Sequence, residues 1–401
     1  METLSSLLLV SLSIGVTAPV SARPRVPVAP WPGVSDVLRN IAVATPAAAW
    51  SPVATWDNDS ERPGSVLVFP KFIRGTFFDA INPVTPAGTG RITARTELEI
   101  SVRCPDGATC GPKQPVTLRA HWVCPGCTES SFDLTTTVGG SLYFNPEGVT
   151  ALGGVVTAEV YPNNATTTIP VPPCPRGYLI VWATDGSGNA IKFDGLIGDA
   201  VLRDGSTGQE YQSARSYNAI SIQAGDGVVN TGDPTDLNGD SNLDFDGNEY
   251  QAISGRIFGT VRYENPGATI TGNAFTVWGV VQTDLTLLTL DVASNRPNPL
   301  TSVGLNFYTT GEDLNDAGTS FYCWSEQRLT DINAGFTEQR MGRKGLVESY
   351  FAEQAGAPVT LLGIVETKEG QINAAGVFIQ FRDYSYSLFH DNNPLMTTFQ
   401  P

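Results

Sequence analysis

Glycine and proline interrupt almost every ten-residue stretch of this chain, and their spacing limits the possible folds more than any motif does. Together the two residue types occupy 41 + 28 = 69 of the 401 positions. In a helix interior, glycine costs about 1 kcal/mol and proline about 3 kcal/mol relative to alanine. Long helices are therefore excluded, and the segments between the breaks have the lengths of strands.

The order of apolar and polar residues within these segments predicts strands. Thr96–Val102 alternates the two kinds, as expected of a strand with one buried face. Ser65–Phe69 and Tyr178–Ala183 are apolar on both faces, which is typical of central strands that are covered on both sides. Val116–Trp122 alternates as well and places His121 on its polar face, where we expect a solvated side chain.

A second group of strands is predicted after residue 255. Its members are Arg256–Tyr263, Thr276–Gln282, Leu285–Val292, Val303–Phe307, Phe321–Ser325, Val359–Val365 and Val377–Phe381. A short helix is expected only within Leu329–Arg343, where Gly335 and Gly342 limit its length.

This spacing of strands and turns predicts an all-β protein with two β-sandwich (Ig-like) units and very little helix. We expect the first sandwich at 64–205 and the second at 255–401. The region 206–254 between them is acidic and rich in turn residues, and it is interpreted as a connection. Residues 23–63 are rich in proline and alanine and are predicted to form an arm or linker.

The first 22 residues have the pattern of a signal peptide. Leu4–Val20 is apolar, and Val20-Ser21-Ala22 offers small residues for cleavage, although no lysine or arginine precedes the run. No later segment reaches the ~18 uninterrupted apolar residues of a membrane-spanning helix. We therefore expect a secreted, cell-surface or periplasmic protein whose mature chain does not insert into a membrane.

The charge balance limits the partners. The chain has 24 basic and 40 acidic side chains, so its net charge is −16. Nucleic acids gain affinity by exchanging counterions for lysine and arginine, so a nucleic-acid partner is not expected. The same sign favours solubility and the binding of cations. Whether the partner is a protein or a carbohydrate is left open.

Six cysteines in an exported chain predict up to three disulfides, and 15 connectivities are possible. These residues are Cys104, Cys110, Cys124, Cys127, Cys174 and Cys323. Cys104 and Cys110 flank a turn-forming insert and are the simplest pair. The Cys124-Pro-Gly-Cys127 motif also fits a redox dithiol, or a zinc site together with His121, Cys104 and Cys110, but structural disulfides are favoured. Cys174 and Cys323 are expected to pair with each other or with this cluster.

One acidic segment carries recognisable ligand chemistry. It places an oxygen-bearing side chain at nearly every second position, and its candidate metal ligands are Asp236, Asn238, Asp240, Asn242, Asp244, Asp246 and Glu249. Ca²⁺ takes about 6–8 such oxygens, and a short loop can curl them around one ion. We expect a calcium site here, with a solvated acidic loop as the alternative.

The same segment resembles the calcium loops of EF-hands and dockerin modules, and more loosely the aspartate-rich repeats of thrombospondins. In that alignment Asp236 takes the first loop position and Leu243 the apolar eighth. Two positions depart from the pattern: Ser241 replaces the glycine of the sharp turn, and Gly247 stands where the bidentate acidic residue is expected. No helix is evident on either side, so the resemblance covers the loop alone.

No catalytic motif accompanies these features. The only two histidines, His121 and His390, are far apart in sequence, and His390 is expected at the surface. Segments such as Pro63–Phe72 and Phe193–Asp199 resemble those of exported, β-rich bacterial proteins without an assigned activity. We therefore expect a noncatalytic, structural or adhesive protein with a calcium-stabilised loop. The alternative is a secreted carbohydrate-active enzyme that uses a carboxylate pair.

Overall fold

The structure is a computed structural model, and it describes residues 62–78, 91–147, 155–161, 165–206, 213–225, 239–266, 268–270, 276–293, 298–372, 378–390, 394–395 and 397–401. All of these residues belong to one compact unit, Pro52–Pro401. The signal peptide predicted at 1–22 and nearly all of the arm predicted at 23–63 lie outside the described residues.

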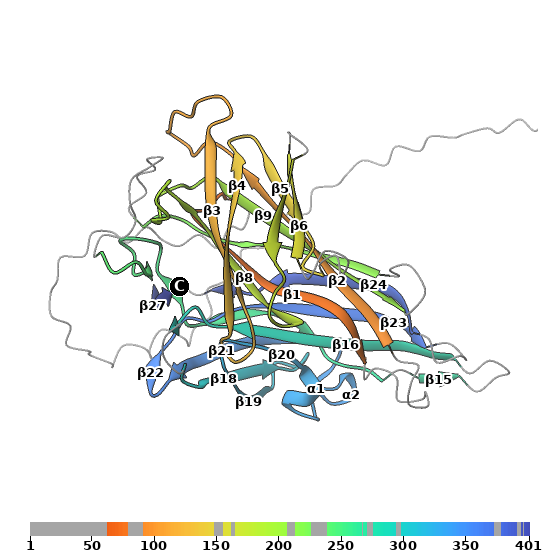
Figure 1. The fold of residues 1–401 in the computed structure, drawn as a ribbon. Coiled ribbons are helices and arrows are strands. Elements are labelled where there is room, and N and C mark those ends of the chain that lie inside the picture. Colours follow the sequence, from red (N-terminus) through yellow and green to blue (C-terminus); the bar gives the residue numbers. More distant parts are fainter. Residues whose placement is uncertain are drawn as a thin grey trace, which may run out of the picture. The chain divides into compact units, whose positions relative to one another are not determined.

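The described chain is almost entirely β, which confirms the predicted fold class (Figure 1). The first half contributes one branched sheet, whose main path has the order β4 (Glu129–Thr137), β3 (Pro115–Val123), β8 (Arg176–Thr184), β1 (Val66–Phe78), β2 (Arg91–Val102), β5 (Ser141–Phe144), β6 (Val155–Tyr161) and β7 (Ala165–Pro170). From this path, β9 (Leu196–Ser206) branches off β2 and carries β10 (Ser213–Asn218), while β11 (Ile220–Ile222) pairs with β1.

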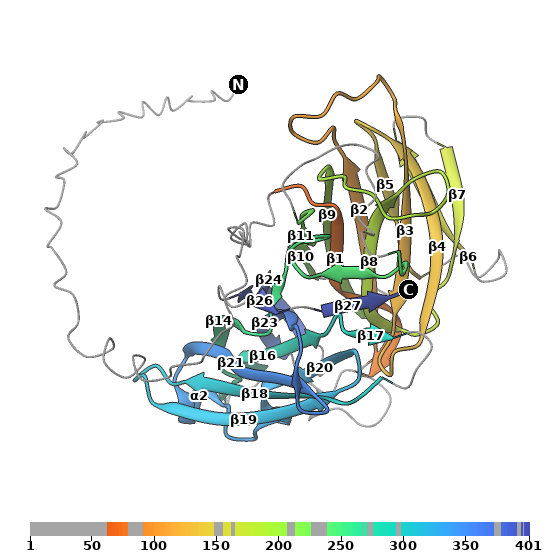
Figure 2. The same ribbon diagram turned by 90° about the vertical axis from the view of Figure 1, so that its left-hand side faces the viewer.

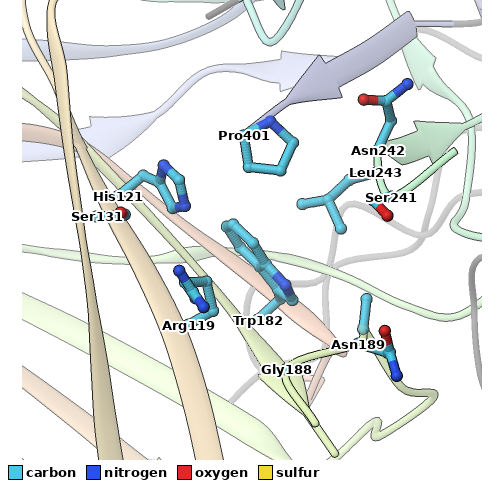
Figure 3. Close-up of a pocket in the computed structure, with 11 residues that line it drawn as sticks. Arg119, His121, Ser131, Trp182, Gly188, Asn189, Ser241, Asn242, Leu243 and Pro401 are labelled. Carbon is cyan, nitrogen blue, oxygen red and sulfur yellow. The ribbon is translucent and has the colours of Figure 1, made fainter.

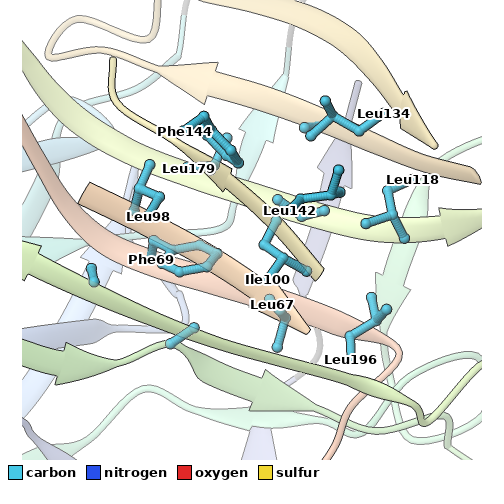
Figure 4. Close-up of a cluster of buried hydrophobic side chains, with 14 of the residues drawn as sticks. Leu67, Phe69, Leu98, Ile100, Leu118, Leu134, Leu142, Phe144, Leu179 and Leu196 are labelled. Carbon is cyan, nitrogen blue, oxygen red and sulfur yellow. The ribbon is translucent and has the colours of Figure 1, made fainter. Parts of the chain in front are cut away.

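The long strand β1 lets this sheet fold onto itself. Its first residues pair with β8 and its last residues pair with β2, and the register shifts between Phe69 and Phe72. The alternating apolar residues of the two arms therefore face each other and form a first core (Figure 4). Leu98 and Ile100 enter this core from one arm, and Leu118 and Leu179 enter it from the other.

The second half contributes two further sheets. One has the order β19 (Leu314–Phe321), β18 (Thr301–Tyr308), β21 (Lys344–Gln354), β14 (Ile257–Arg262) and β25 (Phe389–His390), with β22 (Ala357–Pro358) beside β21. The other has the order β15 (Ala268–Ile270), β16 (Thr276–Leu288), β23 (Leu362–Ile372) and β24 (Phe378–Ser387), with β20 (Trp324–Arg328) beside β16. A second core lies between them and includes Val261, Leu285, Leu305 and Val365.

Short elements complete the described part of the chain. Two helices, α1 (Leu329–Ile332) and α2 (Glu338–Met341), lie within the segment where a short helix was predicted. Three small strands pair in the order β12 (Leu243–Phe245), β27 (Thr397–Gln400) and β17 (Val292–Ala293), and β13 (Ile253–Ser254) pairs with β26 (Pro394–Leu395). Of the described helices, none is long and apolar enough to cross a bilayer.

A third core joins the two halves of the chain. It combines Val66, Val68 and Ile180 of the first half with Leu288 and Leu362 of the second. The central strands β1 and β8 are therefore covered on both faces, which is why their sequences are apolar on both faces. Because this core and the single unit span both halves, the predicted division into two Ig-like sandwiches is not confirmed.

Two predicted strand boundaries are wrong. Thr276–Gln282 and Leu285–Val292 were predicted as separate strands, but β16 runs without a break from Thr276 to Leu288. Its polar Asp284 is buried within the sheet instead of marking a turn. Phe321–Ser325 was predicted as one strand, whereas Cys323 has φ 55° and separates β19 from β20.

Three disulfides confirm the expected oxidised state of the cysteines. Cys104 pairs with Cys110 across the turn-forming insert. The two cysteines of the CxxC motif do not pair with each other, because Cys124 bonds Cys174 and Cys127 bonds Cys323. The second of these crosslinks spans 196 residues and ties the turn between β3 and β4 in the first half to the β19–β20 junction in the second.

Candidate functional site

A pocket of about 340 Å³ lies at the side of strands β3, β4 and β8 (Figure 3). Its wall comprises Arg119, His121, Ser131, Trp182, Gly188, Asn189, Ala190, Ser241, Asn242, Leu243 and Pro401. The volume is within the range of about 300–1,000 Å³ that small-molecule sites occupy, and near its lower end. Polar side chains surround one indole ring there, so the pocket is the candidate binding site.

His121 is the central polar group of this pocket, and its predicted exposure is wrong. Only 4% of the residue is exposed. Its ring stacks on Trp182 at 5.0 Å between centroids and meets the edge of Phe399 at 5.6 Å. The alternation in β3 identified the face of the strand correctly, but β27 near the end of the chain covers that face (Figure 2). Sequence periodicity carries no information about such a distant segment.

The tautomer of the neutral His121 ring follows from its neighbour on β4. Nδ1 lies 3.3 Å from Oε2 of Glu129, and a carboxylate only accepts hydrogen bonds. In the neutral form of the ring, Nδ1 therefore carries the proton, and Nε2 keeps its lone pair. Nε2 is buried and has no hydrogen-bond partner within the described part of the chain. A buried acceptor without a donor costs about 1–3 kcal/mol, so this atom favours a ligand that donates to it.

Ser131 and Glu129 were not singled out from the sequence, yet strand pairing brings both close to His121. Ser131 lies directly opposite His121 in the β3–β4 register, and Glu129 lies two residues away on the same face. The order Ser–His–Glu resembles a hydrolytic triad in residue type. However, Nε2 makes no hydrogen bond, so Ser131 is not held as an activated nucleophile.

The rest of the pocket is polar but electrically balanced. Nε of Arg119 lies 2.7 Å from Oδ1 of Asp133, its cross-strand neighbour, so the positive charge on this wall is already paired. Asn189 closes the turn after β8, where its amide donates to Asp185 at 3.0 Å. No side-chain carboxylate belongs to the described pocket lining.

The predicted calcium segment forms the facing wall. Ser241, Asn242 and Leu243 line the pocket, and β12 begins at Leu243. Ser241 has φ 63°, the left-handed conformation that the glycine of a calcium loop adopts. The sequence departure at this position therefore does not prevent the sharp turn.

The side chains predicted to bind calcium differ in the contacts that they make. Asp236 and Asn238 lie outside the described residues. Asp240 accepts from the backbone of Asn242 at 2.9 Å, and Asp246 accepts from the backbone of Asn248 and Glu249 at 2.7 and 3.1 Å. These bonds are those of turns.

The remaining candidates of the loop point into the fold. Oδ1 of Asp244 accepts from Thr398 of β27 at 2.6 Å, and Glu249 is only 3% exposed. Across the described residues, no three acidic, histidine or cysteine side chains are grouped as a metal site would need. The calcium site therefore stays a prediction.

A second polar cluster lies deep between the two halves of the chain. Lys71 of β1 donates to both Glu326 of β20 and Glu366 of β23, and Arg215 of β10 also pairs with Glu366. Lys71, Arg215 and Glu366 have side chains at most 1% exposed. We call these residues, together with Asp284 and Lys368, the Lys71 cluster.

The pKa values of two acidic members of the Lys71 cluster are shifted in opposite directions. Burial raises the pKa of Asp284 to about 6, even though Lys368 opposes this shift. Burial also raises the pKa of Glu366 by itself, but Arg215 and Lys71 outweigh it and lower the pKa to about 2. The carboxylates of Glu326 and Glu366 are bridged by a lysine and are not open to a substrate, so this cluster fits a structural role better than acid–base chemistry.

The second histidine was also placed wrongly by its sequence context. His390 was expected at the surface beside Asp391, but it is 8% exposed in β25, and its Nε2 donates to the backbone oxygen of Leu361 at 3.0 Å. Burial lowers the pKa of His390 to about 3, so the ring is neutral. It lines no described part of the pocket.

Comparison with known proteins adds little. No family model and no curated protein matches the sequence. Among solved structures, the BSP domain of a biofilm-associated protein is similar with 8% identity and a TM-score of 0.14, over 88% of this chain and 63% of that one. A subviral particle of infectious bursal disease virus VP2 gives 9% identity and a TM-score of 0.12, over 84% and 76% of the two chains. Similarities this weak indicate nothing about function.

Proposed function

We propose that this chain is an exported, noncatalytic β-rich protein of the structural or adhesive class, which binds a partner through the pocket beside Trp182. The observation that carries the proposal is the state of His121. In a hydrolase, the general base makes a hydrogen bond to a nucleophile or to the attacking water. Nε2 of His121 is buried and makes no hydrogen bond within the described residues. No side-chain carboxylate lines the described pocket either. The site is equipped to hold a ligand.

Three disulfides support export, because such crosslinks persist in oxidising compartments. They also support a mechanical role. Cys127–Cys323 and the Lys71 cluster both connect segments that are far apart in the sequence, so a force that pulls on one half of the chain is transmitted to the other.

A calcium ion in the segment 236–249 belongs to the same proposal. The left-handed turn at Ser241 and the density of acidic side chains support it, and β12 connects the loop to β27. The ion would order the wall of the pocket that Ser241, Asn242 and Leu243 form.

The function is tested by deleting the gene and measuring attachment of the cells to surfaces and to each other under flow. The wild-type chain should restore attachment, and Ser320→Ala, at an exposed position of β19 that does not line the pocket, should restore it equally. Hydrolysis of nitrophenyl ester or glycoside substrates by the purified chain would indicate a hydrolase instead. An unchanged deletion strain would contradict the adhesive role.

A further inference from the structure

We infer that the pocket beside Trp182 binds a neutral, polyhydroxylated ring, that is, a single saccharide unit. This inference deepens the proposed function, on which it rests, by naming the ligand class of the same site. It starts from the lone pair on Nε2 of His121, which is buried next to the pocket and receives no hydrogen bond from any described residue. The ligand must therefore bring a donor, such as a hydroxyl group.

The opposite requirement comes from Arg119 and the two asparagines. The Arg119 guanidinium has only donors, and asparagine and serine side chains both donate and accept. Asn189, Asn242 and Ser131 border the same pocket. A ligand that satisfies the whole wall must donate to His121 and accept from Arg119, and a ring with several hydroxyl groups does both.

The charge of the wall favours a neutral ligand over an anion. Arg119 is already paired with Asp133 at 2.7 Å, and Nδ1 of His121 faces the carboxylate of Glu129. The chain as a whole carries −16. An anion would enter a negative field and find no unpaired cation among the described lining residues.

The shape of the pocket limits the ligand to about one ring. Its volume of about 340 Å³ is small, and Trp182 is only 3% exposed because His121 covers one face of the indole. The indole therefore offers no open face that could serve as a platform for a long sugar chain. Specificity must come from the hydroxyl pattern, since buried polar groups reject ligands that leave them unpaired.

The test uses the purified full chain and saturation-transfer NMR, followed by calorimetry. The probes are the methyl glycosides of glucose, galactose and mannose, and N-acetylglucosamine. Glucuronate and acetate test for an anion site, and cyclohexanol tests for a merely apolar one. At least one neutral glycoside should bind, and the deoxy analogue that lacks its donor hydroxyl should bind about tenfold more weakly.

Two variants assign the binding to this pocket. His121→Phe keeps a flat ring against Trp182 but removes the Nε2 acceptor, and Asn242→Ala removes a half-buried amide from the opposite wall. Each should weaken the glycoside about tenfold. Ser320→Ala, at an exposed position of β19, is the matched control and should bind as the wild type does. Asn242→Ala keeps the test decisive if His121→Phe does not fold.

Several results would overturn the inference: no neutral glycoside binds, only glucuronate or acetate binds, cyclohexanol binds as well as the sugars, or both pocket variants bind a glycoside normally. The adhesive function is a separate matter. If no glycoside binds while the gene deletion still abolishes attachment, the proposed function stands and its ligand is not a sugar. If glycosides bind but the gene deletion leaves attachment unaffected, the saccharide site stands and the adhesive function is wrong.

Discussion

Replacing Lys71 by methionine should destabilise the protein severely, because this one ammonium group bridges two buried carboxylates. Lys71 is 1% exposed, and Glu366 is not exposed at all. Methionine fills much of the space of the lysine stem but leaves Glu326 with Arg176 alone and Glu366 with Arg215 and the more distant Lys368. Removing one partner of a buried ion pair costs about 3–5 kcal/mol, because the other charge stays desolvated.

The assay is urea unfolding of the wild type, Lys71→Met and a matched control, all at pH 7. The control is Arg103→Met, which breaks the exposed pair with Asp106 and should cost less than about 1 kcal/mol. A double variant, Lys71→Met with Glu326→Gln, should recover part of the loss, because a carboxylate that has lost its lysine is then neutral and its other partner, Arg176, is 34% exposed to solvent. If Lys71→Met costs no more than Arg103→Met, the Lys71 cluster does not hold the two halves together and the reasoning fails.

Three further predictions follow from the same structure. The pKa of Asp284 is raised to about 6, so its ionisation opposes folding as the pH rises from about 4 to 6. Asp284→Asn should therefore become more stable than the wild type across that window, by up to about 3 kcal/mol. If the free energies of unfolding in urea of the two proteins changed in parallel with pH, the prediction would be contradicted. Replacing Cys127 and Cys323 by serine should cost about 5 kcal/mol, against about 2 kcal/mol for Cys104 and Cys110, because the closed loops span 196 and 6 residues; equal losses in calorimetry would refute the loop argument. Added Ca²⁺ should raise the melting temperature and a chelator should lower it, with Asp240→Ala removing most of the difference; a melting curve that ignores both would leave 236–249 as an acidic loop.

Local pattern was enough to predict the strands and the burial of their centres. Ser65–Phe69 and Tyr178–Ala183 are apolar on both faces, and both lie in the described core with Val66, Leu67 and Val68 fully buried. Cys104–Cys110 was also predictable, since the two residues flank a single turn. In each case the partner or the environment is encoded within a few residues of the position in question.

The site itself was not predictable, because its parts are joined only by tertiary contacts. His121 was expected to be solvated, because no residue near it in the sequence indicates that Phe399 packs against its ring. Glu129 and Ser131 acquire meaning only from the β3–β4 register. The polar Lys71, Asp284 and Glu366 likewise look like surface positions until strands from both halves enclose them. Periodicity describes one strand at a time, whereas burial here depends on a second covering layer.

The pocket and the predicted calcium loop are physically continuous, and that continuity has a thermodynamic consequence. Ser241–Leu243 belongs to the acidic segment and also lines the pocket, while the next residue, Asp244, is fixed to β27 through Thr398. β27 in turn supplies Phe399, which packs against His121. An ion that orders this loop would spare a ligand part of the entropic cost of ordering the same wall, so the two would bind cooperatively without any large rearrangement. By linkage, the factor by which Ca²⁺ tightens the ligand must equal the factor by which the ligand tightens Ca²⁺.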